Sequence, residues 1–473
     1  MQFVNGERRL APSNLHGTAG GDGDGQESGR AGLAVLVALV AAAPAMFGSE
    51  SPTALAVLAL LTGLSLLSLA GGGFVASMPG LAPAARFLLL AVGLLCLWGI
   101  VQAILPVSDA APGSGPPERL SRSPTATLGS VLQLLTHAGA FLAGLAVAMR
   151  PHGADRIACA IAATALAVGL YGFVAWAAGV ERVLWVEKHV YLGYLTGPFV
   201  NRNTAAAYLG LGALVLMSRS VAQAQIQAVP TLNRRRRAMR LLAMLAGRVG
   251  LTAAAAAFLI LCVLLTGSRA GTGALLVGLV ALGIAMRRRR LPVLLLSLTL
   301  SGLFITLLAG GGVAPTAYER LLQEGLDGGN RSAVYGATLR AIADHPVTGT
   351  GLGTFRLVFP AYRDAEMTDW GVWDRAHQIY LELALGAGLP MALFVVAAFV
   401  ATALACLSIA RREPRPQPAA ASAFAVSVAL GVHGLVDFSL QNPAVATTYA
   451  VLLGAGCAPS IRTVLFPRLP RGH

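Results

Sequence analysis

Residues 243–290 read AMLAGRVGLTAAAAAFLILCVLLTGSRAGTGALLVGLVALGIAMRRRR. Two apolar runs, 243–266 and 272–286, flank the polar stretch Gly267-Ser-Arg-Ala-Gly271, and four consecutive arginines follow the second run. An apolar run of about 20 residues can cross the hydrocarbon core of a bilayer as a helix. The stretch therefore predicts two membrane helices with a polar turn on one side and a basic cluster on the other.

The rest of the chain repeats this pattern. Of its 473 residues, 56% are hydrophobic and 12% are charged, and the mean hydropathy of +0.69 excludes an ordinary soluble domain. Glycine and alanine are abundant in the apolar runs, as expected where membrane helices approach closely. We expect an all-α, polytopic membrane protein with about 12 transmembrane helices. The predicted spans lie near residues 31–48, 53–76, 85–106, 128–149, 157–180, 203–218, 243–266, 272–286, 291–310, 386–410, 420–440 and 443–460.

Arginine clusters mark alternate loops between the predicted spans. Basic residues are concentrated in the cytoplasmic loops of membrane proteins. Counting spans places every cluster on the same side as Arg8 and Arg9, so we expect both termini in the cytoplasm. The net charge of +14 therefore reflects membrane topology, and we expect no nucleic-acid partner. The clusters are Arg150–Arg156, Arg234–Arg240, Arg287–Arg290, Arg411–Arg415 and Arg462–Arg471.

The predicted spans divide the chain into five parts. Residues 1–30 are rich in glycine and aspartate and are expected to form a disordered cytoplasmic tail, with no cleavable signal peptide. The first nine transmembrane helices occupy 31–310, a large outer loop occupies 311–385, the last three helices occupy 386–460, and 461–473 form a second tail. The cysteines lie in apolar runs without C-x-x-C spacing, so we expect small buried side chains and no disulfide or zinc site. They are Cys96, Cys159, Cys262, Cys406 and Cys457.

The outer loops carry polar residues in place of basic clusters. Asn201-Arg202-Asn203 stands at the mouth of a span, after an aromatic stretch, 183–194, that we expect in the membrane interface. Arg269 stands between glycines, where backbone N–H groups beside a guanidinium suit an anion such as phosphate. An arginine that reaches lipid headgroups is the alternative interpretation of Arg269.

The loop 311–385 is the large outer loop of this arrangement. Tyr318 to Ala341 has helical character, with Arg331 and Tyr335 at helical spacing, so we expect a helix there. Residues 349–353 read Gly-Thr-Gly-Leu-Gly but lack the following Lys-Ser/Thr of a nucleotide-binding loop. We interpret them as a turn-rich connector.

Three further ionisable side chains belong to the candidate site. His377 directly precedes an apolar helix on the outer side of the membrane. A lone histidine is more often structural than catalytic, but the arginines on the same side favour a functional role. His433 and Asp437 are four residues apart on one helical face. Ionisable residues in a span are costly and usually line a cavity, so we expect this pair to support the site.

Five short motifs occur in order across roughly residues 190–445. They are Gly197-Pro-Phe-Val-Asn-Arg-Asn-Thr204, Thr266-Gly-Ser-Arg-Ala-Gly271, Arg331 with Pro346-Val-Thr-Gly-Thr-Gly-Leu-Gly-Thr-Phe355, Ala376-His-Gln-Ile-Tyr-Leu381 and Asp437-Phe-Ser-Leu-Gln-Asn-Pro443. In this order they resemble the motifs of the O-antigen ligase/polymerase superfamily of bacterial membrane glycosyltransferases. The chain departs from the superfamily pattern at Gln378, where His-Asn is usual, and at Gly386, where an acidic residue is common.

The resemblance implies a GT-C-like fold in the bacterial inner membrane. The large loop would be periplasmic, with short helices above a cavity that holds the active site. The implied reaction transfers a glycan from an undecaprenyl-diphosphate carrier, so the implied partners are this donor, a glycan or lipid A core acceptor, and membrane lipids. A ligase attaches the glycan to the lipid A core, whereas a polymerase attaches it to another repeat unit. We expect the ligase and keep the polymerase as the alternative.

Each candidate residue suits a step of this reaction. Fixed guanidiniums can meet the charge that develops on a diphosphate leaving group without a metal. We therefore expect Arg202 and Arg269 at the diphosphate, with Arg331 as a third cation. His377 is the candidate base for the acceptor hydroxyl, with inversion at the anomeric carbon. No metal or cofactor is expected. Metal-dependent oligosaccharyltransferases hold an acidic pair near the first outer loop, whereas this loop offers only Glu50. Asn201, Asn203 and Tyr380 are the further expected substrate contacts.

A transporter or flippase is the alternative from another functional class, because about 12 spans suit it as well. The sequence contains no obvious inverted repeat, and the outer loops are markedly unequal. A static site on one face of the membrane favours an enzyme.

Overall fold

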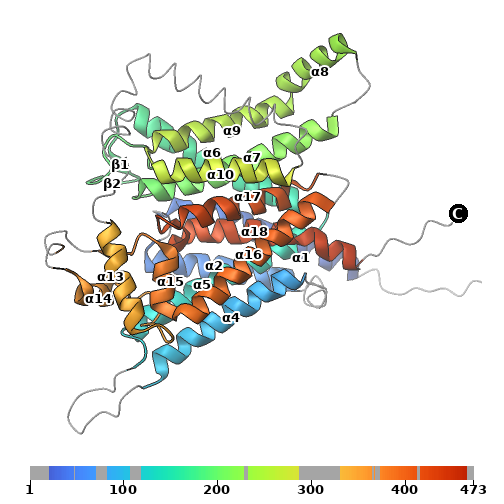
Figure 1. The fold of residues 1–473 in the computed structure, drawn as a ribbon. Coiled ribbons are helices and arrows are strands. Elements are labelled where there is room, and N and C mark those ends of the chain that lie inside the picture. The colour runs from blue at the N-terminus through green and yellow to red at the C-terminus, as the bar shows by residue number, and fades with distance from the viewer. Residues whose placement is uncertain are drawn as a thin grey trace, which may run out of the picture.

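Long apolar helices lie side by side in one bundle (Figure 1). The computed structural model describes residues 21–70 except 47 and 49, and residues 82–106, 119–227, 233–286, 331–364, 367, 373–412 and 416–465. The α-helices are α1 (Gly21–Ala45), α2 (Pro52–Ala70), α4 (Pro83–Ile104), α5 (Pro124–Ala148), α6 (Gly153–Ala177), α7 (Arg202–Gln227), α8 (Arg234–Ala246), α9 (Arg248–Leu265), α10 (Arg269–Ala285), α13 (Arg331–Asp344), α14 (Phe355–Val358), α15 (Ile379–Ala387), α16 (Leu389–Arg412), α17 (Pro418–His433) and α18 (Pro443–Leu465). Two 3₁₀ helices, η3 (Phe359–Tyr362) and η5 (Ser439–Gln441), and two short strands, β1 (Arg182–Val183) and β2 (Val186–Glu187), complete these elements.

The helices confirm an all-α polytopic membrane protein. Within the described ranges, seven helices are long and apolar enough to cross a membrane, and four shorter helices are also apolar. The run predicted at 291–310 lies outside the described residues, as do 1–20, 311–330 and 466–473. Helix α1 begins at Gly21, inside the stretch 1–30 for which the sequence predicts a tail.

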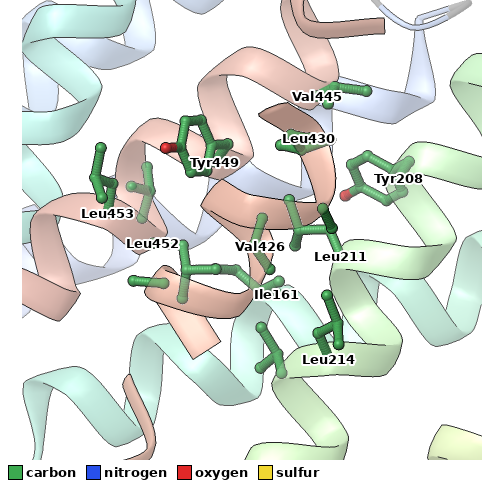
Figure 2. Packing of buried hydrophobic residues seen from close by; sticks show 14 of the residues in the cluster. Ile161, Tyr208, Leu211, Leu214, Val426, Leu430, Val445, Tyr449, Leu452 and Leu453 are labelled. Carbon is green, nitrogen blue, oxygen red and sulfur yellow. The ribbon is translucent and has the colours of Figure 1, made fainter. Parts of the chain in front are cut away.

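Helix α7 forms the centre of the bundle. Nearly all of its side chains are buried, and it packs against α6, α9, α10 and α17. Figure 2 shows Leu211 and Leu214 of α7 beside Val426 and Leu430 of α17, all in one buried apolar cluster. A helix surrounded by protein needs apolar residues on every face, and this explains why the apolar residues of α7 are not confined to one stripe.

Small residues allow the closest helix crossings. A Cβ atom at Gly144 of α5 would lie 2.4 Å from the Val451 carbonyl oxygen of α18, and one at Gly454 would lie 2.1 Å from that of Phe141. Glycine is therefore required on both sides of this crossing. Four of the five cysteines are buried as predicted. The prediction is wrong for Cys159, which is exposed because its face of α6 turns away from the bundle.

The two ends of the bundle differ in what they carry. Helices α13, α14 and α15 and the β1–β2 hairpin gather at one end, whereas α8 and the last turns of α18 lie at the other (Figure 1). The hairpin overlaps the stretch 183–194 that the sequence predicts in the membrane interface. Helix α15 stops before α16 because Gly388 has a φ of +84°, and a Cβ atom there would lie 2.0 Å from the Val347 carbonyl oxygen.

Candidate functional site

Two helices begin with the predicted diphosphate-binding arginines. Arg202 is the first residue of α7, and the Asn201 carboxamide oxygen caps this helix by accepting a hydrogen bond from the Asn203 N–H at 2.7 Å. Arg269 is the first residue of α10, and the Ser268 hydroxyl caps that helix by accepting from the Gly271 N–H at 3.0 Å. Helix N-termini attract anions through their unpaired N–H groups and their dipoles.

The two helix N-termini are joined directly. The Ser268 hydroxyl donates a hydrogen bond of 2.8 Å to the carboxamide oxygen of Asn203, and a Cβ atom at Gly271 would lie 2.4 Å from that of Ala206. Both arginines are half-buried. The N-termini of two helices that each begin with an arginine therefore meet at one place. Asn201 and Asn203, predicted as substrate contacts, build this junction through the bonds described here.

Two tyrosines that sequence reasoning left without a role hold Arg202. Its guanidinium carbon lies 4.5 Å from the centre of the Tyr194 ring and 5.4 Å from that of Tyr191. The Tyr194 ring also occupies the space beside Gly267, where a Cβ atom would lie 2.2 Å from the ring. Tyr194 therefore contacts both arginine-bearing loops. The aromatic residues Tyr191 and Tyr194 were visible in the sequence, but their contact with Arg202 depends on the fold.

His377 lies two residues before α15, in the left-handed region with a φ of +53°. Its ring stands edge-on to Trp373 at 5.3 Å and to Phe438 at 4.9 Å. The Tyr335 hydroxyl donates to the His377 carbonyl oxygen at 3.1 Å. Its Nδ1 atom is buried and has no hydrogen-bond partner among the residues that the structure describes. The aromatic contacts fix the orientation of the ring.

Charges around His377 favour its neutral form. Burial lowers the pKa of His377, and the nearby charge of Arg331 lowers it further, while the carboxylate of Asp437 acts in the opposite direction. Arg331 begins α13, and its guanidinium donates to the Val436 carbonyl oxygen at 2.8 Å. A neutral imidazole at physiological pH is the form that can accept a proton.

Tyr191 lies between the arginine junction and the histidine segment. Burial raises the pKa of Tyr191; the charge of Arg202 opposes this rise and that of Asp437 adds to it. A small cavity provides a second connection, because Gly271 of α10 and His433 of α17 both line it. The structure therefore brings Arg202, Arg269 and the His377 region to the same end of the bundle.

The remaining predicted residues make contacts within the protein. The Tyr380 hydroxyl donates to the Gly431 carbonyl oxygen at 2.6 Å. His433 and Asp437 are both fully buried, and their nearest nitrogen and oxygen atoms lie 3.9 Å apart, beyond hydrogen-bond distance. An Asp437 oxygen accepts from the Phe438 N–H at 2.5 Å. Asp437 thus orders the backbone beside the ring that packs against His377.

The two departures from the superfamily pattern have local explanations. The Gln378 side chain caps α15 by accepting from the Leu381 N–H at 2.7 Å, a bond that the shorter asparagine could also form. Gly386 packs against the connector 349–353, where a Cβ atom would lie 3.2 Å from the Gly351 carbonyl oxygen. The Thr350 and Gly351 N–H groups donate to Leu385 and Gly386, so these two groups are not available to bind a phosphate.

Acidic residues at the site are few. Across the described part of the chain, no group of three or more His, Cys, Asp or Glu side chains could hold a metal ion. Glu50 accepts a hydrogen bond from the Asn442 side chain at 2.8 Å. Glu382, to which sequence reasoning gave no role, is buried on α15 and pairs with Arg375 at 3.5 Å. Its position one turn before Gly386 gave no separate signal in the sequence.

An O-antigen ligase family model matches residues 254–396. The matched segment includes Arg269, Arg331 and His377, while Arg202 and His433 lie outside it. Among curated proteins, none matches the chain.

Proposed function

We propose that this chain, whose residues 254–396 match an O-antigen ligase family model, transfers a glycan from undecaprenyl diphosphate to an acceptor hydroxyl. The preferred acceptor is the lipid A core, which makes the protein a ligase of the bacterial inner membrane with a periplasmic site. The observation that carries the proposal is the junction of two arginine-initiated helix N-termini at the end of the bundle that also holds His377. Such a junction suits the diphosphate of the carrier.

Each step of the reaction has a candidate group. The acceptor oxygen attacks the anomeric carbon, the bond from that carbon to the diphosphate oxygen breaks, and inversion results. His377 takes the proton from the acceptor hydroxyl. Arg202 and Arg269 meet the negative charge left on undecaprenyl diphosphate, and Arg331 adds a third cation. Preorganised cations of this kind stabilise the transition state more than the ground state.

Purified protein in proteoliposomes tests the proposal. With lipid-linked glycan and lipid A core as substrates, we expect the glycan to be joined to the core, and His377→Ala to abolish most of this product. Extension of one lipid-linked unit by another, with no product on the core, would establish the polymerase instead. Movement of lipid-linked glycan across the bilayer without any new glycosidic bond would replace the enzyme with a flippase.

The orientation is tested separately by cysteine labelling. In a Cys159→Ser background, Trp185→Cys places a thiol on the exposed hairpin and Met239→Cys places one on the exposed side of α8. We expect an impermeant thiol reagent to label position 185, and not 239, from outside intact spheroplasts. Labelling of position 239 alone would put the candidate site in the cytoplasm and contradict the proposed localisation.

A further inference from the structure

Glu382 is a buried acid directly behind the His377 segment. It lies on α15 and is 8% exposed. One carboxylate oxygen accepts a hydrogen bond of 3.1 Å from the backbone N–H of Ala376, a residue with no exposed surface. The other oxygen lies 3.5 Å from the Arg375 guanidinium. The carboxylate therefore fixes the two residues that immediately precede His377.

The same carboxylate also contacts the segment on the other side of the His377 ring. The Gln441 side chain, three residues after Phe438, is near enough to this carboxylate to oppose the rise of its pKa. Phe438 and Trp373 are the aromatic rings that pack edge-on against the imidazole. Glu382 thus lies between the backbone before His377 and the segment that contains Phe438, whose ring packs against the imidazole.

His377 needs such support because its backbone is unfavourable. A φ of +53° is uncommon for a residue with a side chain. Conformations of this kind persist where the surroundings over-determine them. The Tyr335 hydroxyl and the Gln378 cap fix the residue from its own carbonyl onward, whereas Glu382 is the group that fixes it from the N-terminal side.

We propose that Glu382 is a positioning residue that holds the imidazole of His377 in place for proton transfer from the acceptor hydroxyl. This role rests on the proposed function and adds to it a residue from outside the superfamily pattern. Burial raises the pKa of Glu382. The carboxyl group can accept the Ala376 hydrogen bond whether or not it carries a proton, and the amide of glutamine can accept it too.

The test compares Glu382→Ala with Glu382→Gln in two backgrounds, wild type and His377→Ala. In the wild-type background we expect Glu382→Ala to lower kcat by about tenfold or more, because the buried Ala376 N–H loses its hydrogen-bond acceptor, and to leave KM for the lipid-linked donor unchanged. Glu382→Gln should retain most of the activity. In the His377→Ala background, Glu382→Ala should cause no further loss, because a positioning residue acts through the group that it positions.

Two further variants guard the interpretation. Glu382→Asp keeps the charge but is too short to reach Ala376 and Gln441 together, so it should fold and still lower kcat with the same non-additivity. Glu187→Ala removes an exposed acid whose partner is Arg182 and should leave kcat unchanged. The Asp variant keeps the test valid if the alanine variant does not fold.

Two results would overturn the role of Glu382. An equal loss of kcat in both backgrounds would show a purely structural effect, and so would a lower melting temperature with unchanged kcat. Full transfer by the His377→Ala single variant is a separate outcome. It would remove His377 as the base in the proposed function, and the role of Glu382 with it.

Discussion

The stack of Tyr194 on Arg202 gives a quantitative prediction. A cation over an aromatic ring contributes about 0.5–1 kcal/mol at exposed sites and about 2 kcal/mol when desolvated. Arg202 is half-buried, and Tyr194 is the nearer of its two rings, at 4.5 Å. Tyr194→Leu should therefore cost roughly 1–2 kcal/mol of Arg202 positioning. If Arg202 binds the diphosphate, affinity for the lipid-linked donor should fall about five- to thirtyfold.

The matched control is Tyr194→Phe, which keeps a ring over the guanidinium. Donor binding to purified protein, measured by titration in nanodiscs, should be close to wild type for phenylalanine and weakened for leucine. Both variants should melt normally, since the stack lies at the margin of the bundle. An equal loss in both variants would assign the effect to the hydroxyl, and unchanged binding by Tyr194→Leu would refute the reasoning.

Three further predictions concern other parts of the site. Arg269→Ala should lower the rate of transfer about tenfold or more. Arg269→Lys should restore little of it, because the lysine ammonium is a point charge and cannot form the two parallel hydrogen bonds of a guanidinium. Normal transfer by Arg269→Ala would favour lipid headgroups as the partner of Arg269. Burial lowers the pKa of His377, so the rate of transfer should fall only as pH drops below the usual histidine pKa of about 6.5. The His377→Gln variant should not show this fall at acidic pH. Gly388→Ala should lower the melting temperature, because the φ of +84° and the Val347 carbonyl oxygen, 2.0 Å from the position of a Cβ atom, exclude a side chain there. An unchanged melting temperature would mean that the break between α15 and α16 does not require glycine.

The membrane architecture could be predicted because one physical rule governs it. Every backbone polar group in lipid must be satisfied within a helix or a barrel, so long apolar runs such as 157–180 have to become helices. The predicted span 386–410 missed the break at Gly388, although glycine followed by Pro390 is a typical helix-ending pattern. The close approach of the Val347 carbonyl, which requires glycine there, is a tertiary contact.

The sequence predicted a set of candidate site residues but not the geometry that the structure gives them. Arg202, Arg269 and His377 were recognisable because charged residues in an apolar chain are few. The partners of these residues were not recognisable. Tyr194 reaches Gly267 from a segment distant in sequence, and Glu382 contacts Ala376 only because the chain turns between them. The Ser268–Asn203 hydrogen bond, which spans 65 residues, leaves no periodic signal.

The central position of α7 isolates one half of the site from the bilayer. Its apolar window is 94% buried, compared with 28% for α2 and 33% for α16. A change in hydrocarbon thickness acts first on helices that contact lipid, which tilt or deform the surrounding bilayer. Arg202 sits on a helix that such changes reach only through its neighbours. The proposed docking point of the carrier should thus keep its geometry in thick and thin membranes alike.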